Sequence, residues 1–364
     1  MAWRAASVAG RVAEDVGELS KIPLAYPAVM RIFGHSMRLF AVLSTFLLLS
    51  GVALSKDFNR ALSIFAENDI GFSDRYYTNG IKIQYTQKGR DFWVNAPQFW
   101  ILDLISDSED ALSFETVSLG QAIYVPQDIE ALIPPSNDRP YAGWLYLNAA
   151  SHVATKNSLD SFAITLGIVG RHSYAEDIQR KWHDIFGFDM PAGWDNQLED
   201  EFGFVISYKH SQRVWRADAP NGVSADAVVS AGADLGNVIT QGYLSVLFRV
   251  GYSLPFSFDA GKIGYCSSTD VRAGAPYDED CHLYFLAGAS ARFIGYDITL
   301  DGNAFASSDW GVDSQWFVFE PVAGVSARWR GVELDLLLTY RTREFKGQGI
   351  GHHTFWTISL KYFF

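Results

Sequence analysis

The sequence lacks the long apolar runs of a helical membrane protein and has few basic residues. After residue 55, no segment reaches the roughly 18 consecutive apolar residues that a membrane-spanning helix needs, and a mean hydropathy of +0.02 is too polar for a helical bundle in a membrane. The 29 basic residues are outnumbered by 41 acidic ones, for a formal net charge of −12. That charge argues against a nucleic-acid partner, and an anionic substrate would need a local basic patch or a bridging cation.

Two common signatures of enzymes are also absent. The sequence has no glycine-rich nucleotide-binding loop and no Gly-x-Ser-x-Gly motif, which marks the nucleophile of many serine esterases. It contains no internal repeat and no low-complexity tract.

An apolar run from Leu39 to Leu49 lies near the N-terminus, directly after Arg38. Together with the small residues that follow it, the run predicts a secretory signal peptide over residues 37–55, because it is too short to span a membrane. A buried core helix is the alternative. We interpret residues 1–36 as an extension that arises from a start codon assigned too early, and residues 56–364 as the exported domain.

Export implies an oxidising compartment. The sequence holds only two cysteines, Cys266 and Cys281. We expect them to close a loop disulfide, although the sequence alone does not establish the pairing.

What the exported domain does have is alternation of apolar and polar residues, with many aromatic residues. In the last stretch, Trp356, Ile358, Leu360, Tyr362 and Phe364 occupy every second position. Such alternation predicts strands with one apolar and one polar face, which a soluble β-sandwich would also show. Three features favour a different all-β fold, a closed antiparallel transmembrane β-barrel. They are the signal peptide, the aromatic residues at strand ends and the aromatic last strand.

The alternation predicts about twelve strands, an even number that suits a closed barrel. Residues 253–281 are the least clear segment and could hide further strands. With both termini in the periplasm, the odd-to-even connections face the cell exterior, and the distinctive polar motifs lie in or beside them. The expected strands are residues 58–69, 77–88, 114–124, 141–153, 160–170, 200–212, 225–235, 241–252, 282–298, 314–329, 331–344 and 352–364.

The connection at residues 171–199 is too long for a hairpin turn and predicts a short helix from Ser173 to Phe186. Ser173 and Glu176 have the spacing of a capping box. Gln179 and His183 lie one helical turn apart on the same polar face. Histidine is the natural general base near neutral pH, and the alternative is a solvated loop histidine.

Two further motifs offer ligands for ions. Asn68 and Asp69 end the first expected strand, and their oxygen atoms suit Ca²⁺, although both residue types are also common in turns. Asp74-Arg75 and Asp138-Arg139 are two acid–base pairs at neighbouring turns. Arginine binds phosphate or carboxylate through two hydrogen bonds, but at least one pair fits a structural ion-pair network at the barrel mouth.

Taken together, the motifs resemble those of the lipid A 3′-O-deacylase family of outer-membrane proteins. The resemblance covers about residues 62–364 and rests on long, ordered motifs. These are ENDIGFSDRYYTNG at 67–80, QAIYVPQDI at 121–129, NDRPYAGW at 137–144, Gln179-x-x-x-His183, PAGWDNQLEDE at 191–201 and RTREF at 341–345.

The resemblance implies a twelve-stranded barrel with a Ca²⁺-dependent hydrolase site between its wall and a helix of an extracellular loop. By similarity, His183 is the base and Gln179 its neighbour, Asn68 and Asp69 are catalytic and metal-binding, and either Asp184 or Asp189 is the acidic partner. The candidate substrate-binding residues in the matching motifs are Arg75, Thr78, Asn79, Arg139 and Tyr141.

The implied substrate is the 3′ acyloxyacyl ester of lipid A in the outer membrane, and we expect a monomer. Arg171, Arg180 and Lys181, beside the helix, are candidates to meet the phosphates of lipopolysaccharide. Two alternatives stay open. One is a calcium-dependent outer-membrane phospholipase, and the other is a non-catalytic porin or surface barrel.

Overall fold

The structure is a computed structural model that describes residues 58–69, 71, 73–90, 97–105, 111–270 and 281–364. The predicted extension at residues 1–36 and the signal peptide at residues 37–55 lie outside the described residues.

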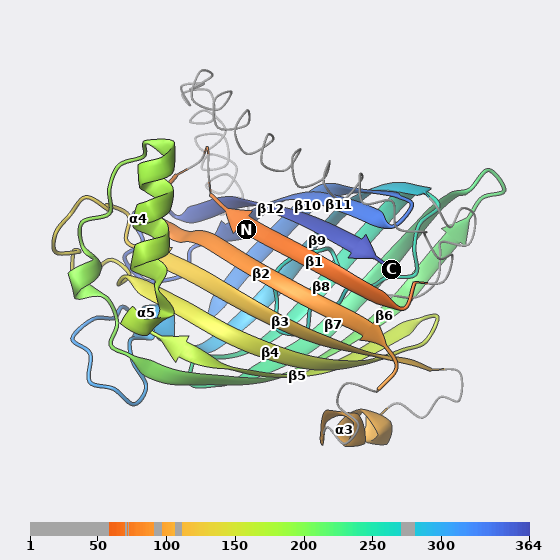
Figure 1. Cartoon of the computed structure of the whole chain (residues 1–364), viewed down its shortest axis with the longest axis horizontal. Coiled ribbons are helices and arrows are strands. Elements are labelled where there is room, and N and C mark those ends of the chain that lie inside the picture. The colour runs from red at the N-terminus through yellow and green to blue at the C-terminus, as the bar shows by residue number, and fades with distance from the viewer. Residues whose placement is uncertain (1–57, 70, 72, 91–96, 106–110, 271–280) are drawn as a thin grey trace, which may run out of the picture. The chain divides into compact units, whose positions relative to one another are not determined.

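Twelve antiparallel strands form one closed barrel in which each strand pairs with its neighbours in sequence and β1 pairs with β12 (Figure 1). The predicted all-β fold and each of the twelve predicted strands are confirmed. The largest boundary error is at β6, which passes a bulge at Arg213 and continues to Asp218. The strands are β1 (Arg60–Asn68), β2 (Tyr76–Lys88), β3 (Leu112–Val125), β4 (Ala142–Ala154), β5 (Ser158–Val169), β6 (Glu201–Asp218), β7 (Val223–Gly236), β8 (Ile239–Tyr252), β9 (Cys281–Asp297), β10 (Phe317–Trp329), β11 (Val332–Thr342) and β12 (His352–Phe363).

The two faces of each strand have opposite character. On β11, Leu334 and Tyr340 point outward and are exposed, whereas Glu333 and Asp335 point into the lumen and are buried. Lys361 of β12 lies 2.7 Å from carboxylate oxygens of both acids. A soluble sandwich would place the apolar face inside, so the apolar exterior and the ion-paired interior are those of a membrane barrel.

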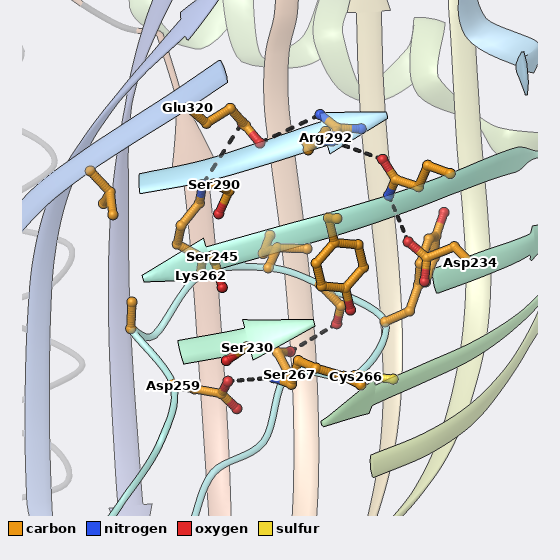
Figure 2. A pocket seen from close by; sticks show the side chains of 18 of the residues that line it. Ser230, Asp234, Ser245, Asp259, Lys262, Cys266, Ser267, Ser290, Arg292 and Glu320 are labelled. Atoms are coloured by element: carbon orange, nitrogen blue, oxygen red, sulfur yellow. Dashed lines mark hydrogen bonds and ion pairs between the residues drawn. The ribbon is translucent and has the colours of Figure 1, made fainter. Parts of the chain in front are cut away.

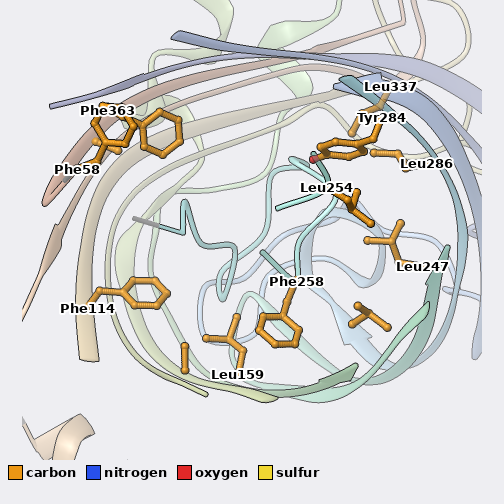
Figure 3. Close-up of a cluster of buried hydrophobic side chains, with 13 residues drawn as sticks. Phe58, Phe114, Leu159, Leu247, Leu254, Phe258, Tyr284, Leu286, Leu337 and Phe363 are labelled. Carbon is orange, nitrogen blue, oxygen red and sulfur yellow. The ribbon is translucent and has the colours of Figure 1, made fainter. Parts of the chain in front are cut away.

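Residues 253–270, called the lumen plug below, fold into the barrel between β8 and β9. Leu254 and Phe258 pack with residues from the inner wall in one apolar cluster (Figure 3). Asp259 pairs with Lys209 of β6 at 2.5 Å. The sequence left open further strands in this segment, but the described part of it, 253–270, contains no strand.

The expected disulfide between Cys266 and Cys281 is not formed, so that prediction is wrong. Cys266 lies in the lumen plug, where it packs against Ala150 and Ala163 of β4 and β5. Cys281 begins β9 and pairs in register with Trp329 of β10. Leu283 and Trp329 are exposed on the outer face that Cys281 shares, so the sheet directs Cys281 outward while Cys266 lies on the lumen side.

The helices lie at the two ends of the barrel. The distal end is where β1 finishes and β2 begins, and the terminal end is where β1 begins and β12 finishes. At the distal end, η2 (Arg171–Ser173), α4 (Ala175–Phe186) and η3 (Trp194–Asn196) lie between β5 and β6, and α5 (Ile298–Asp301) follows β9. At the terminal end, α3 (Pro97–Ile105) lies between β2 and β3 (Figure 1).

The predicted helix in the 171–199 connection is confirmed, but its predicted capping box is wrong. Tyr174, with φ 58°, precedes α4, and no side chain caps the helix. Ser173 belongs to the preceding 3-10 turn, and its hydroxyl donates to the carbonyl of Gly170 at 2.6 Å. Ser173 therefore belongs to the turn before the helix and does not act as the N-cap that its spacing predicted.

Among the described residues, no helix is long and apolar enough to cross a membrane.

Candidate active site between the barrel wall and helix α4

The 171–199 connection packs against the outer face of the barrel wall at the distal end. Gly143 points outward from β4, and a Cβ atom there would lie 2.0 Å from the hydroxyl of Ser173 and 2.4 Å from the Cβ of Ala175. The absence of a side chain at Gly143 thus lets the start of α4 touch the wall. Nearby, the rings of Tyr141 and Trp194 lie 4.8 Å apart in a buried apolar cluster with Ile123 of β3.

Helix α4 turns its polar side toward this wall. Gln179 and His183 are buried, as their shared face predicts, whereas Ile178 and Ile185 are 41% and 64% exposed. The Nε1 atom of Trp194 donates to Oε1 of Gln179 at 2.8 Å. The arrangement is the reverse of an ordinary surface helix, which buries its apolar side.

The two ring nitrogens of His183 have different partners. Nδ1 lies 2.5 Å from the carbonyl oxygen of Asp189, and Nε2 lies 3.3 Å from Oδ2 of Asp74. A carbonyl oxygen only accepts hydrogen bonds, so Nδ1 carries the proton in the neutral ring and Nε2 is the basic nitrogen. The left-handed conformation of Gly187, with φ 71°, ends α4 and returns the chain toward the imidazole.

The hydroxyl of Thr78 joins two carboxylates beside the histidine. Its oxygen lies 3.0 Å from Oδ1 of Asp69 and 2.9 Å from Oδ1 of Asp74. Asp69 also accepts hydrogen bonds from the hydroxyl of Ser73 and the backbone N–H of Arg75. The bulge of β2 between Tyr77 and Asn79 makes room for Thr78 at this point of the strand.

Burial raises the pKa of both carboxyl groups. The pKa of Asp69 lies well above its ordinary value, because its desolvation outweighs its hydrogen bonds to Ser73, Arg75 and Thr78. Desolvation also raises the pKa of Asp74, and nearby His183 opposes that rise. The hydrogen-bond donors that Asp69 meets in the described residues are neutral, so none of them balances the charge of its ionised form.

Two buried side-chain amide atoms in this region lack a hydrogen-bond partner among the described residues. They are Oδ1 of Asn79 and Nε2 of Gln179. Asn79 pairs in register with Asn68, whose Nδ2 donates to the carbonyl of Thr78 at 2.8 Å. Buried polar atoms normally have partners, so such atoms beside buried acids favour a place for a ligand.

The oxygen atoms at this point fit a hard cation. No group of three or more His, Cys, Asp or Glu side chains in the described residues forms a metal cluster. Ca²⁺, however, also takes amide and main-chain carbonyl oxygens. Asn68, Asp69 and Asn79 supply that mixture of donors from neighbouring strands.

Not all predicted site residues gather here. Arg139 is fully buried at the distal mouth of the lumen, where Nη2 donates to Thr299 and Nη1 lies 3.5 Å from Oε2 of Glu344. Tyr141 lies beneath the docked loop, and its hydroxyl donates to the carbonyl of Ile129. The carboxylate of Asp138 accepts from two backbone N–H groups, those of Gln127 and Arg139.

Arg75 lies next to the site but contacts it through its backbone. Its N–H donates to Asp69, and its guanidinium carbon is 5.6 Å from the ring centroid of Tyr76. Its Nε is buried without a hydrogen-bond partner in the described part of the chain.

Two contacts of the site were not found in the sequence. The histidine's carboxylate partner is Asp74, about a hundred residues before His183 in the chain, whereas Asp189 contributes only its carbonyl oxygen and Asp184 is exposed. Trp194 is the residue that fixes Gln179. The PAGW and SDRYY motifs contained both residues, but their spacing could not show which partner each would meet.

A cavity of about 330 Å³ lies elsewhere, inside the lumen. Arg292, Glu320, Lys262 and Asp259 point into it, and the lumen plug crosses it (Figure 2). Neither His183 nor Asp74 lines this cavity. The candidate site lies instead on the outside of the wall, between helix α4 and the strands.

Comparison with known families identifies the fold of the protein and the membrane to which it belongs. The sequence matches the family described as Outer membrane protein LpxR over residues 39–364. The chain belongs to the LpxR family. This match confirms the family resemblance of the motifs, and the LpxR-family barrel is an outer-membrane protein.

One solved structure agrees with the LpxR-family fold. The chain is similar to LpxR from Salmonella typhimurium, with 20% identity and a TM-score of 0.68 over 84% of this chain and 100% of that one. The β-domain of a Bordetella autotransporter gives 12% identity and a TM-score of 0.41 over 85% and 99% of the two chains. No curated protein matches the sequence significantly.

Proposed function

We propose that the protein hydrolyses the 3′ acyloxyacyl ester of lipid A in a Ca²⁺-dependent reaction, with His183 as the general base. The observation that carries the proposal is the basic Nε2 of a buried histidine, 3.3 Å from Asp74, on the outer, lipid-facing side of the barrel wall. Membership of the LpxR family supports lipid A as the substrate.

The proton path follows from the two partners of His183. Nδ1 donates to the carbonyl oxygen of Asp189, so Nε2 removes a proton from a water molecule as its oxygen attacks the ester carbonyl. The carboxylate of Asp74 stabilises the imidazolium that forms. The imidazolium then returns the proton to the 3′ oxygen as its bond to the acyl carbon breaks, which releases a fatty acid and a 3′ hydroxyl.

The residues that would hold Ca²⁺ are Asn68, Asp69 and Asn79. When bound, the cation would polarise the ester carbonyl and stabilise negative charge on its oxygen. Asp69 is the charged ligand of this set. Gln179, held by Trp194, presents an amide N–H that has no hydrogen-bond partner within the described ranges, and it orients the substrate.

The substrate would reach the site along the outer surface of the wall. Asn79 points to the same outer face as Ile81 on β2, and Gly143 lies on the same outer face as Leu147 on β4. Ile81 and Leu147 are both exposed. The acyl chains can therefore stay against the apolar wall while the ester reaches His183. Arg171 and Lys181 are exposed on the docked 171–199 connection and would meet the phosphates.

This reaction also requires an orientation. Lipopolysaccharide occupies the outer leaflet, so we propose that the distal end of the barrel faces the cell surface. The long 171–199 connection at that end, and the start of β1 and the end of β12 at the other, agree with this direction.

Incubation of purified protein with lipid A, followed by mass spectrometry, tests the proposal. We expect loss of the 3′ acyloxyacyl group and release of the matching acid, only when Ca²⁺ is present. Release of fatty acid from glycerophospholipids but not from lipid A would establish the phospholipase alternative. No hydrolysis of either lipid would support the non-catalytic barrel, against which the lumen plug is itself an argument because it occupies the pore.

A further inference from the structure

Helix α3 lies against the outer face of the wall at the terminal end, on the side that faces lipid. Phe99 and Leu102 are buried against Val153, Phe162 and Tyr208, which point outward from β4, β5 and β6. The side chain of Gln98 approaches the carbonyl of Ala149. The helix is therefore placed beside the barrel and not beneath its opening.

An ion pair fixes the position of the helix. The guanidinium of Arg90, beyond the end of β2, contacts both carboxylate oxygens of Asp103 at 2.8 and 2.6 Å, and it lies 4.4 Å from the ring centroid of Phe99. Asp103 is the only charged residue of α3. The pair thus neutralises the helix and ties it to the wall.

The other side of α3 is apolar and uncovered. Trp100 is 68% exposed and Leu104 is 87% exposed, and Ile101 and Ile105 extend the same surface. A short helix with four large apolar side chains directed outward would be an unusual aqueous surface. It continues the exposed apolar wall, where Leu147 and Leu166 lie on neighbouring strands.

The distance along the wall also places α3 at a membrane border. On β4, Gly143 touches the docked 171–199 connection and Val153 touches α3, ten residues further along the strand. At about 3.3 Å per residue the contacts are roughly 33 Å apart, and a strand tilt of about 40° reduces this to about 25 Å along the barrel axis. An outward apolar band of such barrels is about 25 Å tall.

We propose that α3 is an interfacial membrane helix whose Trp100, Ile101, Leu104 and Ile105 insert among the acyl chains of the leaflet at the terminal end. This role does not depend on the hydrolase. The outer wall of the barrel packs against one side of α3, and the Arg90–Asp103 pair holds the helix at the membrane interface. The aromatic ring of Trp100 suits the boundary between acyl chains and headgroups.

Nitroxide accessibility in proteoliposomes of phosphatidylethanolamine and phosphatidylglycerol tests this placement. The label is attached at Leu104→Cys in a full-length Cys281→Ser background, since Cys266 is buried. Matched labels at Leu166→Cys, on the outer wall, and at Asn221→Cys, in the exposed β6–β7 turn, give the lipid and water references. We expect position 104 to match position 166, with strong relaxation by oxygen and little by a water-soluble nickel chelate.

Relaxation at position 104 equal to that at position 221 would overturn the proposal, because the apolar surface of α3 would then face water. A protein partner would be the alternative occupant of that surface. Dipolar broadening at position 104 would overturn it in favour of a second copy of the chain. As a second measurement on a milder variant, brominated lipids should quench more emission from the parent than from Trp100→Phe. Equal quenchable emission from the two proteins would contradict insertion.

Discussion

The Nε2 atom of His183 on helix α4 lies 3.3 Å from Oδ2 of Asp74, in the turn between β1 and β2. The pair joins two segments far apart in sequence, one on the helix and one at the end of the wall. Thr78 extends the contact to Asp69, so one short chain of hydrogen-bonding groups links the base to the end of β1. The chemistry of the site depends on that juxtaposition.

Replacing the base should remove activity without unfolding the barrel. For His183→Ala, we expect the rate of lipid A deacylation to fall on the order of 10²–10⁴-fold, the usual contribution of a positioned general base. The helix is docked outside the closed sheet, so heat-modifiable migration on gels should match that of the parent. Deacylation at the parent rate by the purified variant would show that His183 is not the base.

Asp74→Asn should also be strongly impaired, for a different reason. The amide would keep an acceptor for Thr78, but its N–H would donate to Nε2 of His183 and occupy the lone pair that the base needs. We expect kcat to fall on the order of 10²-fold or more with a smaller change in KM. Asp184→Asn, on the exposed side of α4, is the matched control and should retain the parent rate. Equal effects of the two substitutions would argue against Asp74 as the partner.

The strands and the histidine were accessible from the sequence because both depend on local pattern. Alternation of period two fixes which residues of β11 and β12 face lipid, and the spacing of Gln179 and His183 fixes their common face. The pairing of Asp74 with His183 depends on how the 171–199 connection docks, which local spacing does not encode. The same holds for Cys266, whose position depends on the path of the lumen plug and not on its distance in sequence from Cys281.

The local sequence pattern led to a wrong prediction at Ser173, and the reason is physical. Ser173 and Glu176 have the spacing of a capping box, yet contact with Gly143 and Gln121 draws Ser173 into a 3-10 turn. Arg139 is similar, since its motif placed it near the site but its guanidinium reaches inward to Glu344. A motif identifies a turn, and the bulges and packing of that turn decide which side of the wall a side chain meets.

Calcium removal should stop the reaction reversibly. We expect excess chelator to abolish lipid A hydrolysis and added Ca²⁺ to restore it, because the buried acid Asp69 has neutral donors as its hydrogen-bond partners. Asn79→Leu should raise the Ca²⁺ concentration needed for half-maximal rate, since it removes the unpartnered Oδ1. Calorimetry of Ca²⁺ binding to parent and variant gives a readout independent of turnover. Full activity in excess chelator would contradict a cation requirement.

Gly143→Ala tests whether the docking of α4 on the wall creates the site. The new Cβ would overlap the hydroxyl of Ser173 and the Cβ of Ala175, so the helix must move outward while the strand pairing of β4 can persist. A displacement of about 1 Å at a reacting group costs on the order of 10²-fold in rate, and we expect a loss of that size. Gly242→Ala is the control, because a Cβ there would meet only a carbonyl oxygen 3.9 Å away on another part of the wall. Both variants should migrate as folded barrels, and only Gly143→Ala should lose deacylation activity. If Gly143→Ala keeps the parent rate, the contact between α4 and β4 does not position His183.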